Sequence, residues 1–144
     1  MTENYHPSVI IRRAAAADIP ALQAFITPFV NDGKLLPRTL DEFEELLPNF
    51  FVAEHEGQMV GCAALEIYSR KLAEVRSLAV SPQVQGLGIG KRLVQACLER
   101  AREQHILEVM AITSSDRFFL SCGFEFTLPG EKKALFYQTR DTIE

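Results

Sequence analysis

Three glycines alternate with other residues at positions 85–90, which read Gln-Gly-Leu-Gly-Ile-Gly. The segment follows a strand-forming run that ends at Leu78-Ala79-Val80, and it precedes a helical pattern that begins at Lys91. Glycine has no Cβ, so its backbone can turn sharply and aim successive N–H groups at one point, just where a helix N-terminus adds partial positive charge. The sequence therefore predicts a strand–loop–helix unit whose loop binds an anion, and the expected anion is a pyrophosphate.

Two other phosphate-binding patterns do not fit this loop. A P-loop of the Walker type needs a hydroxyl residue after its Gly-Lys pair, but Gly90-Lys91 is followed by Arg92. A dinucleotide-binding loop would need a third glycine at the position of Lys91 and an acidic residue at the end of a second strand about 20 residues further on, where this sequence is helical. The remaining alternative is a glycine-rich turn that binds no ligand.

The composition restricts what such a chain can bind. With 144 residues, of which 47% are hydrophobic and 24% charged, we expect one globular domain with a substantial core. A net charge of −4 argues against a nucleic-acid partner, because binding a polyanion needs clustered Lys and Arg. The spacing of Cys62, Cys97 and Cys122 predicts reduced, mostly buried thiols and no metal site. The polar N-terminus and the short apolar runs predict no membrane partner and a cytoplasmic location.

Strand and helix patterns alternate along the rest of the chain. Apolar runs and period-two alternation predict strands at residues 9–12, 50–54, 59–68, 71–80, 106–112, 124–127 and 134–138, with 106–112 as a central strand. Helical spacing predicts helices at residues 19–30 and 39–47, from residue 91 onward, and between Ser114 or Ser115 and Cys122-Gly123. Asp18 is expected to cap the first helix, and Thr39 and Glu42 to form a capping box for the second.

The glycine segment and the order of elements resemble a known superfamily. Gln-x-x-Gly-x-Gly after a strand ending Leu-Ala-Val-Ser-Pro is similar to motif A of the GNAT acetyltransferases, which bind the pyrophosphate of acetyl-coenzyme A. The resemblance implies an α+β, single-domain GNAT fold over residues 1–144, with a mixed, mostly antiparallel twisted sheet flanked by helices and with residues 1–7 as a flexible N-terminus. It also implies acetyl-CoA as the co-substrate, bound by Leu78, Ala79, Val80, Gln85, Gly86, Leu87, Gly88, Ile89, Gly90 and Lys91.

A narrower resemblance covers nearly the whole chain. Leu-Leu-Pro-Arg-Thr at residues 35–39 and Gly-Cys-Ala-Ala-Leu at residues 61–65 are similar to the short amino-acid N-acetyltransferases, the N-acetylglutamate synthases. In that family an arginine at the position of Arg38 binds the α-carboxylate of glutamate, and a guanidinium suits a planar carboxylate. Some members carry a lysine where this chain has Glu66, with the opposite charge. The residues expected on the acceptor side are Arg38, Glu66, Arg76, Thr113, Lys132 and Lys133.

Arg38, Lys132 and Lys133 also have a plainer interpretation, in which they are solvated loop residues that bind no substrate.

Glu74 is the candidate general base for the acetyl transfer that the resemblance implies. Strand alternation predicts that it shares one face with Leu78 and Val80 and directs its carboxylate toward the cleft, where it would take the amine proton directly or through water. The alternative is that Glu74 pairs with Arg76 or Lys71 on an exposed strand.

The remaining catalytic tasks are to stabilise an oxyanion and to protonate a thiolate. Backbone N–H groups near Leu78 are the expected oxyanion donors, as in the family. Many superfamily members protonate the thiolate with a tyrosine where this chain has Phe119, so the acid is expected to be water or a hydroxyl such as Ser121. Cys122 has no histidine placed beside it and is expected to be a structural thiol.

The sequence leaves the acceptor open. The first hypothesis is N-acetyl transfer to a small amino acid or related metabolite, with glutamate as one candidate. The second is transfer to a cationic amine, such as a polyamine or a protein N-terminus, which Glu66 would attract. The third is an acyl-CoA-binding regulator without turnover. A small-molecule amine is the expected partner, and a homodimer is the one protein assembly considered.

Overall fold

The computed structural model describes residues 8–127, 130–131 and 133–139. They fall into two compact units that divide between Ser114 and Ser115, so the expected single domain over residues 1–144 stays a prediction. The expected flexible segment, residues 1–7, lies outside the described residues. None of the described helices is long and apolar enough to cross a membrane.

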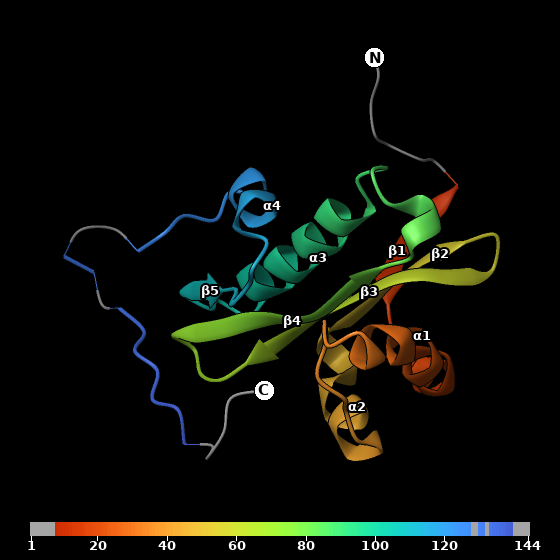
Figure 1. Ribbon diagram of the computed structural model, residues 1–144, viewed down its shortest axis with the longest axis horizontal. Helices are drawn as coiled ribbons and strands as arrows, with labels where there is room; N and C mark the ends of the chain where they lie inside the picture. The colour runs from red at the N-terminus through yellow and green to blue at the C-terminus, as the bar shows by residue number, and fades with distance from the viewer. Residues whose placement is uncertain (1–7, 128–129, 132, 140–144) are drawn as a thin grey trace. The chain divides into compact units, whose positions relative to one another are not determined.

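A five-stranded sheet forms the centre of the first unit (Figure 1). Its strands follow the spatial order β1-β2-β3-β4-β5, which is also their order along the chain. The first four strands pair antiparallel, and β5 pairs parallel with β4. The expected mixed, mostly antiparallel α+β sheet is therefore confirmed. The strands are β1 (Val9–Arg13), β2 (Phe50–His55), β3 (Gln58–Ile67), β4 (Leu72–Val80) and β5 (Glu108–Met110).

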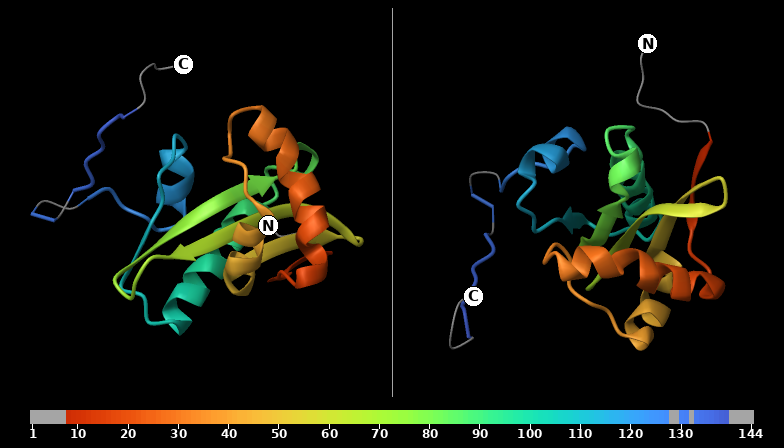
Figure 2. Two further views of the ribbon diagram at one scale, coloured as in Figure 1. Left: turned by 90° about the horizontal axis from the view of Figure 1, so that it is seen from below. Right: turned by 45° about the vertical axis from the view of Figure 1, so that its right-hand side comes forward.

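Helices cover both faces of this sheet (Figures 1 and 2). The helices α1 (Ile19–Asn31) and α2 (Leu40–Leu46) lie on one face, and α3 (Ile89–Glu103) lies on the other. Neighbouring residues of β3 distinguish the two faces, because successive side chains of a strand point in opposite directions. Cys62 packs in the core cluster with Leu22 and Phe43, whereas a Cβ on Gly61 would meet the side chain of Leu93 at 3.0 Å.

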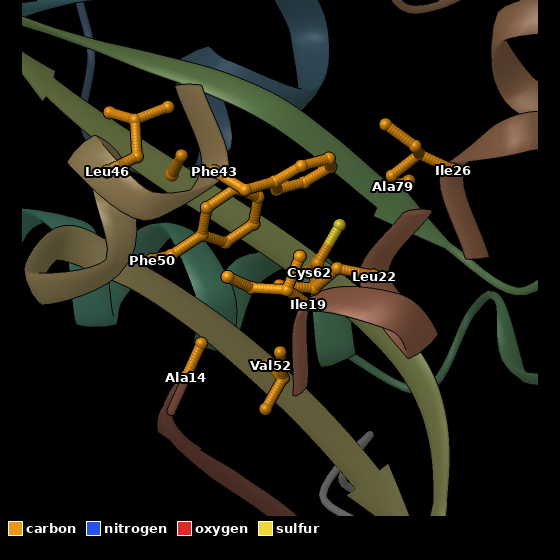
Figure 3. Packing of buried hydrophobic residues seen from close by; sticks show 11 residues of the cluster. Ala14, Ile19, Leu22, Ile26, Phe43, Leu46, Phe50, Val52, Cys62 and Ala79 are labelled. Carbon is orange, nitrogen blue, oxygen red and sulfur yellow. The ribbon is translucent and has the colours of Figure 1, made fainter. Parts of the chain in front are cut away.

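The core beneath α1 and α2 is dominated by aromatic and branched side chains (Figure 3). Phe43 of α2 and Phe50 of β2 are fully buried, with ring centroids 5.9 Å apart. The capping box of α2 forms as expected: Glu42 N–H donates to Thr39 Oγ1, and Glu42 Oε1 accepts from Thr39 N–H. Burying Phe43 while satisfying the helix end fixes the loop that leads into α2, residues 32–39, against the sheet.

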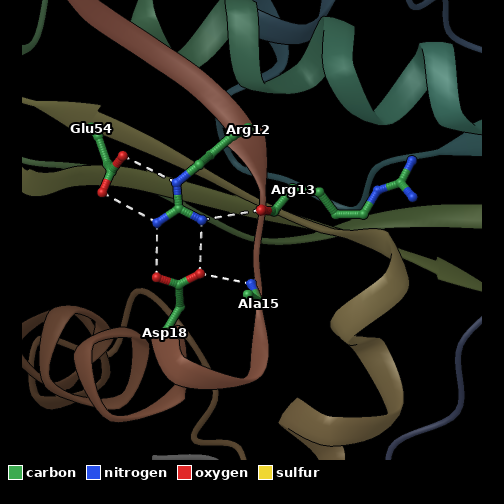
Figure 4. Close-up of polar contacts among 5 residues, drawn as sticks. All are labelled: Arg12, Arg13, Ala15, Asp18 and Glu54. Carbon is green, nitrogen blue, oxygen red and sulfur yellow. Dashed lines mark hydrogen bonds and ion pairs between the residues drawn. The ribbon is translucent and has the colours of Figure 1, made fainter.

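Asp18 does not cap α1 with its side chain, contrary to the expectation. Its carboxylate instead accepts two 2.8 Å hydrogen bonds from the guanidinium of Arg12 and one from the Ala15 N–H (Figure 4). Arg12 also donates to both carboxylate oxygens of Glu54 on β2. A forked guanidinium between two carboxylates is a stronger partner than the helix end, and it ties β1, β2 and the start of α1 together.

Some of the helices and strands predicted from the sequence differ from those in the structure. The helix α3 begins at Ile89 rather than Lys91, so the last glycine of the loop belongs to its first turn. The strand β5 covers only Glu108–Met110 and is the last strand of the described sheet rather than a central one. Residues 124–127 and 134–138 form no strand. Apolar patterning supplies strand propensity, but a strand also needs a hydrogen-bonded partner.

The second unit contains one short helix, α4 (Asp116–Ser121). Phe119 stacks edge-on against both Phe118 and Phe124, with ring centroids 5.1 Å apart in each pair. The chain then turns at Gly123, whose φ of 97° is a backbone angle that glycine adopts readily and other residues rarely do. These three aromatic rings pack against one another within the second unit.

Candidate functional site

The glycine loop has a conformation that other residues would resist. Gly86 and Gly88 have φ values of 86° and 80°, in the left-handed region, and Gly88 is the N-cap of α3. Gly86 has open space around the position of a Cβ, so its backbone angle and not crowding favours glycine there. Gln85 Nε2 donates to the carbonyl of Val80 over 3.0 Å and links the loop to the end of β4.

This loop fits a pyrophosphate. No side chain caps the start of α3, and the first N–H groups of a helix have no partner within the helix. The N–H groups of Ile89, Gly90 and Lys91 are these groups, and together with the helix dipole they favour an anion. The cofactor-binding residues named from the sequence therefore lie in one segment, from the end of β4 to the first turn of α3.

A bulge interrupts β4 just before this segment. In the β3–β4 register Ala64 pairs with Arg76, but Cys62 pairs with Ala79, so β4 carries one extra residue there. Ser77 has a φ of 56°, which is rare for a residue other than glycine. The bulge reverses the alternation, so Glu74 and Arg76 share a face with Ala79. The prediction that Glu74 shares a face with Leu78 and Val80 was wrong, because it assumed an unbroken strand.

The two parallel strands, β4 and β5, separate beyond Glu74. β5 pairs with β4 only through Leu72, Ala73 and Glu74. Among the described residues, the edge of β4 from Val75 to Val80 therefore has no ladder partner on the β5 side. Free backbone N–H groups next to the glycine loop are what an oxyanion needs. This arrangement supports Leu78 as a main-chain donor, which stays a prediction.

Charged side chains gather on the α1–α2 face of β3 and β4, upstream of the bulge. Glu74 is buried, with 7% of its surface exposed. Its Oε1 accepts a 2.6 Å hydrogen bond from Tyr68 Oη and lies 4.0 Å from Arg76 Nη1. Arg76 Nη1 also donates to Glu66 Oε1 over 3.0 Å. The alternative for Glu74 was pairing with Arg76 or Lys71 on an exposed strand. Arg76 does lie 4.0 Å from the carboxylate, but the carboxylate is buried and not exposed.

Arg38 reaches this cluster from the loop between α1 and α2. Its side chain is only 7% exposed, and its Nη2 lies 4.0 Å from Glu66 Oε1. Its Nε donates to Ser77 Oγ over 2.7 Å, so the bulge holds the guanidinium. Burial, followed by the neighbouring Arg76, lowers the pKa of Arg38 from its ordinary value. Arg38 is therefore a buried residue of the cluster and not a solvated loop arginine.

Among the residues that the structure describes, the thiols and histidines show no arrangement for covalent or metal chemistry. Burial raises the pKa of both Cys62 and Cys97 to about 12, which keeps them as unreactive thiols. Cys62 donates to the carbonyl of Ser77 over 3.2 Å. Cys62 and Cys97 are free thiols and buried, as expected, and Cys122 is half-buried. Within the described part of the chain, His, Cys, Asp and Glu form no group of three or more that could hold a metal ion.

Four further site residues were predicted from the sequence, Thr113, Ser121, Lys132 and Lys133. Thr113 lies beyond the end of β5. Ser121 and Lys133 belong to the second unit, in which Ser121 Oγ donates to the carbonyl of Phe118 over 2.6 Å. Lys132 lies outside the described residues. The roles of these four residues stay predictions.

Two residues of the cluster were missed from the sequence, Tyr68 and Ser77. Tyr68 stands two positions after Glu66, so strand alternation places both on one face, and this signal could have found it. Ser77 acts through its left-handed backbone and its contact with Arg38, which is 39 positions away. A serine within a strand-forming run gives no local signal for a left-handed backbone or for a contact with a distant arginine.

Comparisons with known proteins agree with this geometry. Residues 19–124 match the Acetyltransferase (GNAT) family. Because the match covers well over half of the sequence, the chain belongs to the GNAT acetyltransferase family. It is an acetyl-CoA-dependent acetyltransferase of the GNAT type, and the resemblance inferred from its motifs is confirmed.

Similar proteins include amino-acid acetyltransferases. An uncharacterized N-acetyltransferase of Chlorobaculum tepidum is 35% identical over 80% of this chain and 74% of its own length. An amino-acid acetyltransferase of Mycobacterium tuberculosis is 36% identical over 80% of this chain and 67% of its own length. The structure of N-acetylglutamate synthase from Neisseria gonorrhoeae with coenzyme A and N-acetyl-glutamate is 35% identical over 78% of this chain, with a TM-score of 0.70. The chain spans 27% of that synthase, and 27% of the amino-acid acetyltransferases of Neisseria meningitidis.

Proposed function

We propose that this chain acetylates the α-amine of an amino acid. The observation that carries the proposal is that a buried guanidinium, Arg38, and a buried carboxylate, Glu74, belong to one cluster, in which Glu66 and Arg76 connect them. An α-amino acid presents a carboxylate and an amine a few ångströms apart, and these two groups match the two buried charges. The relatives named amino-acid acetyltransferases support the same substrate class, and glutamate is the amino acid named among the structures.

Arg38 has donors left for a substrate carboxylate. Within the described residues its guanidinium makes one hydrogen bond, from Nε to Ser77 Oγ. The Nη atoms remain, and a planar fork with free Nη groups suits a carboxylate better than a point charge does. Since Ser77 fixes Nε, the direction of the fork is set before the substrate binds, which lowers the entropy cost of binding.

Glu74 is the residue that would take the amine proton. Acetyl-CoA supplies the acetyl thioester, and the chain must deliver a neutral amine to it. Tyr68 donates to Glu74 Oε1 and holds the carboxylate in place. The second carboxylate oxygen, Glu74 Oε2, accepts no hydrogen bond from the described residues and is available to the amine. The N–H groups near Leu78 would stabilise the developing oxyanion, four residues further along the same strand.

The hypothesis of a cationic acceptor receives little support. It required Glu66 to attract a positive charge, but Glu66 lies 3.0 Å from Arg76 and 4.0 Å from Arg38. Two guanidinium groups already neutralise this carboxylate, so a polyamine gains little from it. The noncatalytic regulator is disfavoured by the buried Glu74, because a chain that only binds acyl-CoA has no need of a buried carboxylate in this position.

A thiol-release screen tests the proposed function. Acetyl-CoA is mixed with the purified chain and, separately, with each of the common amino acids, polyamines and short peptides, and free thiol is measured over time. We expect release with one or more α-amino acids and at most background release with polyamines. The Glu74→Gln variant measures the background. Turnover only with amines that lack a carboxylate would contradict the proposal.

A further inference from the structure

Glu66 holds a position between two guanidinium groups. Its Oε1 accepts a hydrogen bond from Arg76 Nη1 over 3.0 Å and lies 4.0 Å from Arg38 Nη2. The side chain is 31% exposed, so its carboxylate stands at the edge of the cluster, where substrate would enter. Glu66 is also the register partner of Glu74 on the neighbouring strand.

The charges of the cluster are already balanced. Arg38 and Arg76 contribute two positive charges, and Glu66 and Glu74 contribute two negative ones. Arg76 donates hydrogen bonds to two groups of the protein, Glu66 Oε1 and, at 3.5 Å, Tyr68 Oη. The Nη atoms of Arg38 donate no hydrogen bond within the described residues. The cluster therefore has free guanidinium donors for one substrate carboxylate and not for two.

We propose that Glu66 is a specificity-determining residue that excludes acidic side chains, so that the acceptor is a neutral α-amino acid. The inference rests on the proposed function and narrows its substrate class. The α-carboxylate of the substrate binds Arg38. A second substrate carboxylate would need the guanidinium of Arg76, but this group is already hydrogen-bonded to Glu66. An acceptor with an acidic side chain would therefore bury a second carboxylate with no unpaired cation beside it, which is energetically costly.

A cavity next to Arg38 fits the same conclusion. It has a volume of about 130 Å³ and lies between α1, the loop at Pro37 and α2. Four of its seven lining residues are apolar, the other three include no carboxylate and no cation besides Arg38, and the set is Gln23, Ile26, Thr27, Val30, Pro37, Arg38 and Phe43. A cavity of roughly this size can hold a small hydrocarbon group. It is therefore suited to an uncharged side chain.

The test compares glutamine with glutamate, which have the same shape and differ in side-chain charge. We expect wild-type kcat/KM to be at least about tenfold higher for glutamine than for glutamate. In Glu66→Gln, which keeps an oxygen acceptor for Arg76 but removes the charge, the glutamate-to-glutamine ratio should rise by about tenfold or more, mainly through the KM of glutamate. Glu66→Asp keeps the charge and should leave the ratio near the wild-type value.

Glu99→Gln is the matched control, because it removes the same charge from an exposed position on α3. Its selectivity ratio should equal that of the wild type. Thermal melting and the Kd of acetyl-CoA verify that each variant is folded. A wild type that prefers glutamate overturns the inference even if no variant folds, and so does an unchanged ratio in folded Glu66→Gln. In both cases the proposed amino-acid acetylation stands, whereas a chain that acetylates no amino acid overturns both.

Discussion

Glu66 and Glu74 are direct register partners on β3 and β4, so two carboxylates face each other on the same side of the sheet. Like charges in such a position destabilise a sheet unless a cation separates them. Arg76 provides it, with the same Nη1 atom 3.0 Å from Glu66 and 4.0 Å from Glu74. The arrangement divides the tasks: Glu66 neutralises Arg76 at the edge of the cluster, and Glu74 stays buried with Tyr68 as its hydrogen-bond donor.

Replacing Glu74 tests its role as the base. In Glu74→Gln we expect kcat to fall by roughly 100-fold near neutral pH, since that is the usual effect of removing one positioned base, with little change in the Kd of acetyl-CoA. The rate of the variant should recover partly as pH rises, because more of the acceptor amine is then already neutral. Steady-state kinetics across pH and calorimetry measure both quantities. A variant with wild-type turnover and pH profile would show that another group takes the proton.

Tyr68→Phe tests whether the 2.6 Å hydrogen bond positions Glu74. The ring is kept and only the hydroxyl is lost, so the fold should be preserved. Hydrogen bonds to charged groups contribute about 1.5–3 kcal/mol, and we expect kcat to fall by about tenfold or more while the Kd of acetyl-CoA is unchanged. Tyr137→Phe removes the hydroxyl of a residue that is 89% exposed and serves as the control. Equal kcat in all three proteins would exclude a role for Tyr68.

Arg38→Ala should raise the KM of the amino-acid acceptor by at least about tenfold, because a charge-assisted pair with the α-carboxylate is lost. Binding of acetyl-CoA should be unaffected. Arg38→Lys should restore the KM only in part, since lysine has no planar fork. Arg102→Ala, at a position whose side chain is 69% exposed, is the matched control. An unchanged acceptor KM in folded Arg38→Ala would mean that the carboxylate binds elsewhere.

Gly88→Glu tests the glycine loop. The new side chain would place a negative charge at the N-terminus of α3, and we expect the Kd of acetyl-CoA to rise by at least about tenfold. Gly57→Glu controls for backbone strain, because Gly57 has a φ of 79° against 80° for Gly88 but lies in the β2–β3 turn. Both variants should lose similar stability, and only Gly88→Glu should lose affinity. Calorimetry with equal losses of affinity would contradict this.

The Arg12–Asp18 pair predicts a pH dependence of stability. Hydrogen bonding from Arg12 is the main cause that lowers the pKa of Asp18 from 3.8 to about 2. Because the folded pKa is the lower one, the pair stabilises the fold fully above about pH 4, and this contribution is lost as pH falls toward 2. Asp18→Asn should therefore cost about 1–2 kcal/mol of unfolding free energy at pH 7, allowing for solvent contact, and almost nothing near pH 2. Urea unfolding at both pH values measures this, with Glu99→Gln as control. A loss independent of pH would point to packing instead.

Several features were predictable because their causes are local. The glycines of the loop and the capping box of Thr39 and Glu42 each depend on neighbours within a few positions. Strand alternation likewise placed Glu74 on β4. The final strands were not predictable in the same way, since residues 124–127 and 134–138 have strand propensity but no pairing partner among the described residues.

The amino-acid sequence by itself determined the glycine loop between β4 and α3 and the order of the elements from β1 to β5, because residue type and short spacing carry these signals, whereas the choice of Arg38 as a site residue came from the resemblance to a known family. Only the tertiary structure decided what the site residues contact. The bulge at Ser77 reversed the face of β4, Ser77 fixed Arg38 from 39 positions away, and β3 brought Glu66 and Tyr68 to Glu74. Register and long-range contacts depend on how strands pair, and a one-residue shift exchanges the two faces of a strand.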